Sequence, residues 1–99
     1  MTQEEYENDI ELNDKIIVAR GGPKPGILYP FYPRSIEAAY ALEDEVPEDQ
    51  QEIYAQFLVN IIFRDTDKYV STYRKAHATP RQRCEAWLAW TQQRGEGVK

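Results

Sequence analysis

The chain has 99 residues and a formal net charge of −5, and 41% of its residues are hydrophobic. This length fits one domain, and this hydrophobic content is enough to build a core, so we expect residues 1–99 to fold as a single domain rather than to stay disordered. Because the chain has one cysteine, Cys84, and one histidine, His77, we exclude an internal disulfide and a Cys/His zinc site, and we expect no metal and no cofactor.

The N-terminal sequence is acidic and predicts a helix. Thr2 and Glu5 have the spacing of a capping box, and apolar residues follow at helical spacing, so we predict a first helix over residues 3–13. The segment has neither the basic nor the apolar region of a signal peptide, and the longest apolar run, residues 57–63, is too short to cross a membrane. We therefore expect a cytoplasmic protein that does not bind a membrane.

Residues 21–33 hold three of the five glycines and four of the six prolines. Because proline lacks an amide proton and both residue types favour turns, we predict a non-helical connector here. The alternative is a short β-hairpin that pairs residues 15–20 with residues 27–32, in which Pro30 would confine the second strand to a sheet edge. The Ile-Ile-Val sequence at residues 16–18 fits either the last turn of the first helix or an extended segment.

The end of this connector, residues 29–35, has the sequence YPFYPRS. As a polyproline II helix it would carry a PxxP pattern, which is typical of recognition peptides. We favour the alternative, in which the prolines direct the chain across the core and Tyr29, Phe31 or Tyr32 packs over the apolar stripe of a helix at residues 47–63.

The start of the connector, GGPKPG at residues 21–26, has no large side chain to bury. We therefore predict that Gly22, Pro23, Lys24 and Pro25 contact a partner. An exposed Gly-Pro dipeptide is one that a prolyl isomerase can bind, because its peptide bond can populate the cis form.

Two helices follow the connector. Ser35 is placed to N-cap a helix over residues 36–44, and we expect Ile36, Ala39 and Tyr40 to face inward. Pro47 and the acidic residues that follow it are a favourable start for the next helix, residues 47–63. Its apolar residues form a broad stripe, so we predict that it is the central helix of the core; the stripe consists of Ile53, Tyr54, Phe57, Leu58, Ile61 and Ile62.

Two more helices complete the chain. Asp65 or Thr66 can start a helix that ends near residue 77, and Thr79, Pro80 and Gln82 supply an N-cap, a first-turn proline and a capping-box partner for a last helix to residue 94.

Together these elements predict a mainly α protein, a small bundle of about four to five helices with an N-terminal Gly/Pro-rich connector. Residues 1–34 would hold the first helix and the connector, residues 35–94 the helical core, and residues 95–99 a tail.

Catalytic motifs are missing from the sequence. Cys84 would need a base, and it shares an apolar face with Trp87 and Leu88, so we expect a buried thiol rather than a nucleophile. His77 lies at a predicted helix end, where a cap is the expected role. Phosphate-binding, zinc-protease and serine-hydrolase motifs do not occur. We therefore expect that the protein is not an enzyme.

Charge is divided along the chain: residues 1–63 carry 13 acidic and 4 basic side chains, whereas residues 64–99 carry 4 acidic and 8 basic ones. This polarity can pair internally, steer partners, or drive head-to-tail association between copies.

Basic residues gather around the predicted turn before the last helix, and we predict that Arg74, Lys75, Arg81 and Arg83 form a second contact with a partner. The acidic segments 4–14 and 43–52, which could occupy a basic groove on a partner, are the alternative for this contact. The alternative is a helix-turn-helix-like DNA-binding domain, in which Arg81, Gln82 and Arg83 read base edges from the first turn of the last helix. The acidic net charge disfavours approach to a polyanion.

A short, acidic, helical chain with the Gly/Pro loop GGPKPG and no catalytic motif resembles the small accessory proteins that phages use to bind host enzymes, including inhibitors of the RecBCD nuclease. The resemblance implies a non-catalytic protein-interaction module that binds and modulates a larger host protein, a nucleic-acid-processing enzyme. It also implies that a host prolyl isomerase is recruited at the Gly-Pro loop.

Overall fold

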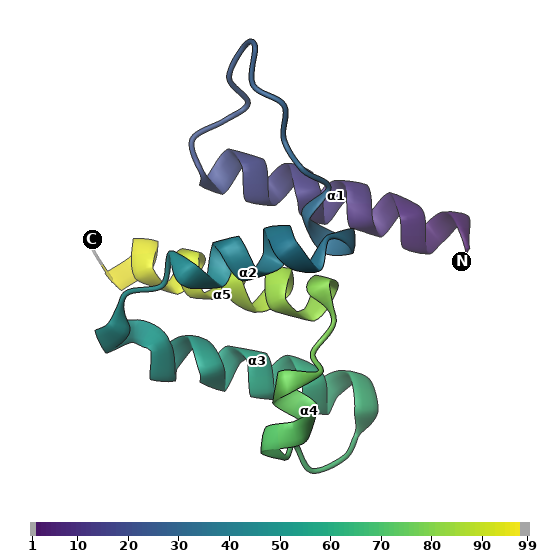
Figure 1. Cartoon of the computed structure of the whole chain (residues 1–99), viewed down its shortest axis with the longest axis vertical. Coiled ribbons are helices and arrows are strands. Elements are labelled where there is room, and N and C mark those ends of the chain that lie inside the picture. Colours follow the sequence, from purple (N-terminus) through teal and green to yellow (C-terminus); the bar gives the residue numbers. More distant parts are fainter. Residues whose placement is uncertain (1, 98–99) are drawn as a thin grey trace.

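The computed structural model describes residues 2–97, and the described chain is a bundle of five α-helices without β-strands (Figure 1). This confirms the predicted small helical bundle. Two short 3-10 helices, η1 and η2, lie between the α-helices. In chain order the elements are α1 (Gln3–Ala19), η1 (Tyr32–Arg34), α2 (Ile36–Asp44), η2 (Glu48–Gln50), α3 (Gln51–Thr66), α4 (Thr72–Ala76) and α5 (Pro80–Gly97).

Three predicted helix starts are confirmed by their capping hydrogen bonds. The Thr2 hydroxyl oxygen accepts a hydrogen bond from the backbone amide three residues later at 3.1 Å, and Ser35 does the same for α2 at 3.2 Å. At α5 the capping box is reciprocal, since the Gln82 amide donates to the Thr79 hydroxyl and the Thr79 amide donates to the Gln82 side chain. Local sequence therefore sets where these helices begin.

The first helix is longer than the sequence predicted, because α1 continues to Ala19 rather than ending at residue 13. Leu12 and fully buried Ile16 lie on one face of it, so burial holds the β-branched residues in a helix. Residues 15–19 are thus helical, and the hairpin alternative for residues 15–20 is wrong.

The helix predicted between residues 66 and 77 is also different. α3 continues through Thr66 and ends at Asp67, whose φ of 53° is left-handed, and only Thr72–Ala76 are helical afterwards. α5 in turn extends beyond residue 94 to Gly97, so the predicted tail of residues 95–99 is helical as far as the structure describes it. Residues 98 and 99 lie outside the described chain.

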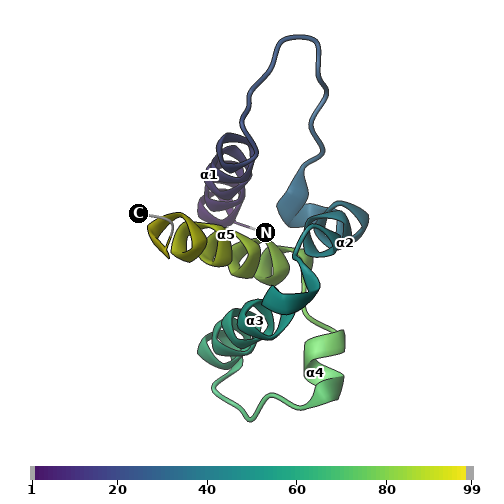
Figure 2. The ribbon, with the colours of Figure 1, turned by 90° about the vertical axis from the view of Figure 1, so that its left-hand side faces the viewer.

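The central helix is α5, which packs against α1, α2, α3 and η1 (Figures 1 and 2). We predicted the helix at residues 47–63 for this place, because its apolar stripe is the clearest in the sequence. Several sides of α5 are buried, and its own buried residues are small or aromatic, among them Cys84, Ala86, Trp87 and Trp90. Burial on several sides removes the one-sided pattern by which a core helix is recognised in a sequence.

The proline-aromatic segment packs on α1, α2 and α5 through η1, and not on α3 as predicted. Tyr32 is buried with 5% of its surface exposed, and its backbone amide donates to the Asn13 side-chain oxygen at 2.8 Å. The segment follows α5 because α5 occupies the centre. In α2, Ala39 faces inward as expected, but Ile36 and Tyr40 are exposed, since the buried face of the helix consists of Ala38, Ala39 and Leu42.

None of the described helices is long and apolar enough to span a bilayer.

Candidate functional site

The connection between α1 and η1, residues 20–31, projects from the helical body as a loop (Figures 1 and 2). α1 ends by returning its backbone: the Gly22 amide donates to the Ile17 carbonyl at 2.9 Å, and the Gly21 amide donates to the Val18 carbonyl at 2.9 Å. Gly21 has a φ of 91°, a conformation that residues with a side chain rarely adopt. This glycine lets the chain leave the helix at a steep angle.

The base of this loop is closed by Tyr29. Its phenolic oxygen accepts a hydrogen bond from the Lys24 backbone amide at 2.9 Å. A Cβ atom on Gly22 would lie 2.6 Å from the same oxygen, so only glycine allows the phenol to reach this place. The Gly22–Pro23 peptide bond is cis. The loop therefore has a shape that its own residues hold.

The part of the loop that leads to Tyr29 carries two exposed apolar side chains. Leu28 has 98% of its surface exposed, the largest value among the exposed apolar side chains of the described chain, and Ile27 has 50%. Pro23, Lys24 and Pro25, three of the residues we predicted to contact a partner, are exposed beside them, and Gly22 is partly covered.

Sequence reasoning missed Ile27 and Leu28, because two apolar residues without a periodic pattern did not stand out from core residues.

Arg83 is not on the surface. It is 6% exposed, its Nη1 atom lies 2.7 Å from a Glu43 carboxylate oxygen, and its other guanidinium nitrogens donate to the backbone carbonyls of Lys75, Ala76 and Ala78. It thus closes the C-terminal end of α4, where carbonyls have no partner in the helix. We do not retain Arg83 as a contact residue.

Tyr54 shares the carboxylate of Glu43 with Arg83. Its hydroxyl donates to the second Glu43 oxygen at 2.5 Å. Burial raises the pKa of Tyr54 well above its ordinary value, and the hydrogen bond to Glu43 adds to the effect. The phenol therefore stays protonated and serves as a fixed donor, and the three side chains join α2, α3 and α5.

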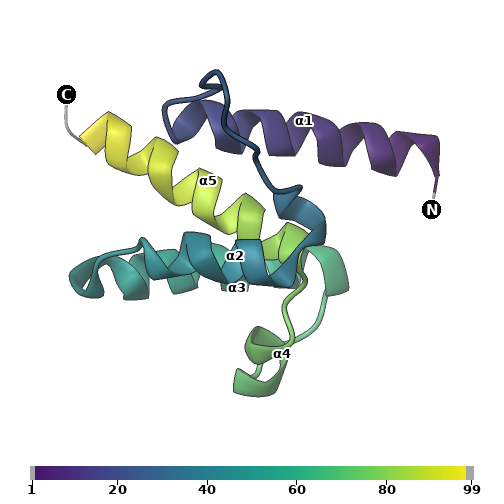
Figure 3. The same ribbon diagram turned by 45° about the horizontal axis from the view of Figure 1, so that its top comes forward.

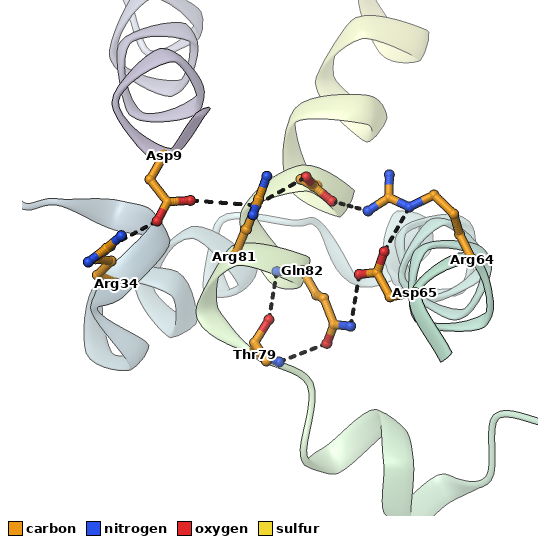
Figure 4. Close-up of polar contacts among 8 residues, drawn as sticks. Asp9, Arg34, Arg64, Asp65, Thr79, Arg81 and Gln82 are labelled. Atoms are coloured by element: carbon orange, nitrogen blue, oxygen red, sulfur yellow. Dashed lines mark hydrogen bonds and ion pairs between the residues drawn. The ribbon is translucent and has the colours of Figure 1, made fainter. Parts of the chain in front are cut away.

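Arg81 belongs to a second polar network, which crosses α5 (Figure 4). Its Nε atom lies 3.5 Å from buried Asp9 of α1 and 3.6 Å from Glu85 of its own helix. Asp9 also accepts a 2.8 Å hydrogen bond from Arg34. Because Arg83 is buried and Arg81, whose side chain is 40% exposed, is paired with Asp9 and Glu85, the first turn of α5 does not present the pair of free arginines that the DNA-binding alternative requires.

The network continues from Glu85 to α3. Arg64 lies 2.7 Å from Glu85 and 2.9 Å from Asp65, and Asp65 accepts a hydrogen bond from the capping residue Gln82 at 3.1 Å (Figure 4). The carboxylates of Asp65 and Glu85 are therefore both paired with arginines.

Arg74 and Lys75, the other half of the predicted basic cluster, form no ion pair in the described chain. The structure therefore divides the predicted cluster: Arg81 and Arg83 of α5 are paired with carboxylates, whereas Arg74 and Lys75 of α4 are not.

The candidate nucleophile Cys84 is fully buried, and this burial raises its pKa to about 12, so the thiol is inert at neutral pH. His77 is the C-cap of α4, where its Nδ1 atom lies 2.8 Å from the Tyr73 carbonyl oxygen. In residues 2–97 no group of histidine, cysteine and carboxylate side chains is arranged to hold a metal ion.

Comparison with known proteins places no relative beside this chain: no family model, no curated protein and no solved structure matches it.

Proposed function

We propose that this chain is a non-catalytic protein-interaction module that binds and modulates a larger protein through the loop of residues 20–31. The observation that carries the proposal is Leu28, which is 98% exposed on a loop that holds its own shape. Irregular connections of this length in a small domain are usually functional.

The free energy of burying apolar side chains supports a contact through Leu28 and Ile27. Removing a leucine or isoleucine side chain from water is worth about 1.5–3 kcal/mol. Leu28 gains almost none of this free energy in the free protein and Ile27 gains only part of it, so burial in a pocket on a partner would supply the rest. Because the Tyr29 hydroxyl already fixes the loop base, binding costs less ordering entropy than it would for a flexible peptide.

The proposed partner is a cytoplasmic enzyme of a host cell that processes nucleic acid, following the resemblance to phage accessory proteins. A prolyl isomerase is the second proposed partner. Pro23 and Pro25 are both exposed, so an isomerase can reach either X-Pro bond from solvent.

The test is capture from a nuclease-treated host extract, with the bound proteins identified by mass spectrometry and binding then measured with each purified protein. Leu28→Ser should weaken binding about tenfold or more, because the lost burial is worth at least about 1.5 kcal/mol. Phe63→Ser is the matched control: this side chain is 51% exposed, it lies on α3, and it is away from the loop sequence.

Circular dichroism should show equal helix content in both variants. If Leu28→Ser and Phe63→Ser bind the purified partner as tightly as the parent chain does, the loop is not the contact and the proposal is wrong.

A further inference from the structure

A second surface, residues 68–77, carries an excess of unpaired positive charge. In the part of the chain whose side chains are described, four lysine and arginine residues make no ion pair, and three of them lie in this segment: Lys68, Arg74 and Lys75. The fourth is Lys24 in the loop. No acidic residue occurs between residues 68 and 77, although Asp67 directly precedes them.

The same segment holds the two most exposed aromatic side chains of the described chain. Tyr69 is 84% exposed and Tyr73 is 71% exposed, although the protein buries other tyrosines well. The Tyr73 ring stacks on His77 with the ring centroids 4.1 Å apart and an angle of 27° between the planes. This contact steadies one face of Tyr73 and leaves the ring open to solvent.

The surroundings of Tyr73 are hollowed. A depression of about 560 Å³ lies between α3, α4 and the start of α5, and its polar lining includes Ser71, Tyr73, Arg74, His77, Thr79 and Gln82. Ser71, Thr79 and Gln82 already serve as capping residues, so the groups of this lining that can hydrogen-bond to the edge of a flat polar ligand are the Tyr73 hydroxyl and the Arg74 guanidinium.

The position of α4 keeps this segment accessible. In the described chain the backbone of α4 lies close to that of α3 alone among the helices, and α4 stands away from the main body (Figure 3). The Arg83 guanidinium donates hydrogen bonds to the C-terminal carbonyls of α4. It therefore anchors the segment of residues 68–77 and leaves Tyr69 and Tyr73 exposed.

We propose that residues 68–77 form a binding site for single-stranded nucleic acid. Tyr69 and Tyr73 stack on unpaired bases, while Lys68, Arg74 and Lys75 contact the phosphates. Exposed aromatic rings combined with cations and few carboxylates are the pattern by which proteins bind single strands without sequence preference.

The chemistry favours a single strand over two other anionic partners. In a duplex the base faces are already stacked and the tyrosine rings cannot reach them. An acidic peptide would satisfy the cations, but it offers no flat ring for the two tyrosines. The site uses other residues than the loop of residues 20–31, so a result that rejects one of the two proposals does not reject the other.

The experiment is fluorescence anisotropy of a labelled oligothymidine of about 12 nucleotides, a length that matches the site size of small single-strand binders. We expect binding at low salt that weakens as salt rises, with a log–log slope of about −2 for three phosphate contacts. A duplex of equal length and polyglutamate are the comparison ligands, and both should bind more weakly.

Variants separate stacking from charge. Tyr73→Ala should weaken oligothymidine binding about tenfold and leave the salt slope unchanged, whereas Tyr73→Phe, which keeps the ring, should bind like the parent chain. Lys75→Gln should make the slope shallower by about 0.7. Lys24→Gln removes an equally unpaired lysine from the loop and should have little effect.

Three results would overturn the site: no binding at low salt, duplex or polyglutamate binding as tight as that of oligothymidine, or a loss in Lys24→Gln equal to that in Lys75→Gln. Tyr73→Phe and Lys24→Gln change exposed side chains and Lys75→Gln changes a half-buried one that makes no ion pair, so these variants remain informative if Tyr73→Ala disturbs α4.

Discussion

The Nη1 atom of Arg83 lies 2.7 Å from an oxygen of Glu43, so the first turn of α5 is tied to the last turn of α2, 40 residues earlier. The same guanidinium holds the final carbonyls of α4. One buried side chain therefore connects three helices, and an arginine that sequence reasoning assigned to a partner is part of the core.

The Arg83–Glu43 pair predicts a large effect on stability. Arg83→Ala should lower the free energy of unfolding by about 3 kcal/mol, because it leaves the Glu43 carboxylate largely buried without its cation and frees the carbonyls at the end of α4. Urea unfolding followed by circular dichroism measures this. Arg74→Ala is the matched control, and we expect it to change stability by less than about 0.5 kcal/mol. A cost for Arg83→Ala no larger than that of the control would contradict the assigned role.

Asp9 should matter more than the other carboxylates of α1. Asp9→Asn removes the charge that faces both Arg34 and Arg81, and since Asp9 is 6% exposed we expect a loss of about 2 kcal/mol in unfolding free energy. Glu11→Gln breaks only an exposed pair with Lys15 and should cost less than about 0.5 kcal/mol. Equal midpoints for the two variants in urea would show that the buried network adds nothing.

Stability should fall in alkaline solution. The pKa of Cys84 is raised by burial from 9.0 to about 12, so above pH 9 the unfolded chain releases a proton that the folded chain keeps. The unfolded state then binds fewer protons, and the unfolding free energy drops with pH by up to about 1.4 kcal/mol per unit between pH 9 and 12. Below pH 9 the Cys84 thiol is protonated in both the folded and the unfolded state, so it does not make the unfolding free energy depend on pH.

This alkaline loss is checked by urea unfolding at several pH values. Cys84→Ala should make the slope shallower between pH 9 and 10, where the cysteine contributes most; as the pH approaches and passes 10 the raised pKa of Tyr54 adds a similar loss. An unchanged slope between pH 9 and 10 in Cys84→Ala would rule out the buried thiol as its cause. A thiol reagent at pH 8 should modify only unfolded chains.

The loop base can be tested without a partner. In Gly22→Ala the new Cβ would lie 2.6 Å from the Tyr29 hydroxyl oxygen, so the phenol must move and the Lys24 amide loses its acceptor. Tyr29→Phe removes the acceptor directly. Both variants should accelerate hydrogen exchange of the Lys24 amide in NMR spectra and change overall stability by about 1 kcal/mol or less. Unchanged exchange in both would mean that the hydrogen bond does not order the loop.

Sequence reasoning predicted the caps and the helical class because these depend on neighbours along the chain. The N-caps at Thr2, Ser35 and Thr79 need only a side-chain oxygen and an amide three residues later. It predicted α5 as a helix but missed its central place, since Trp87 and Trp90 are buried by partners from several helices and leave no one-sided pattern.

For the candidate sites the limit was the same. Arg83 and Arg74 are equivalent in the sequence, and only the position of Glu43 under α5 makes one structural and leaves the other free. Leu28 lies in no periodic pattern, and only the projection of the loop from the helical body leaves it 98% exposed.

The two ion pairs that join the first half of the described chain to the second run from a carboxylate of α1 or α2 to an arginine of α5. A proteolytic cut between α2 and α3 would separate an acidic peptide from a slightly basic one. These peptides would attract one another and find the same burial for Trp87 and Trp90, so the nicked protein should stay assembled. The division of charge along the chain thus makes the protein suited to fragment complementation.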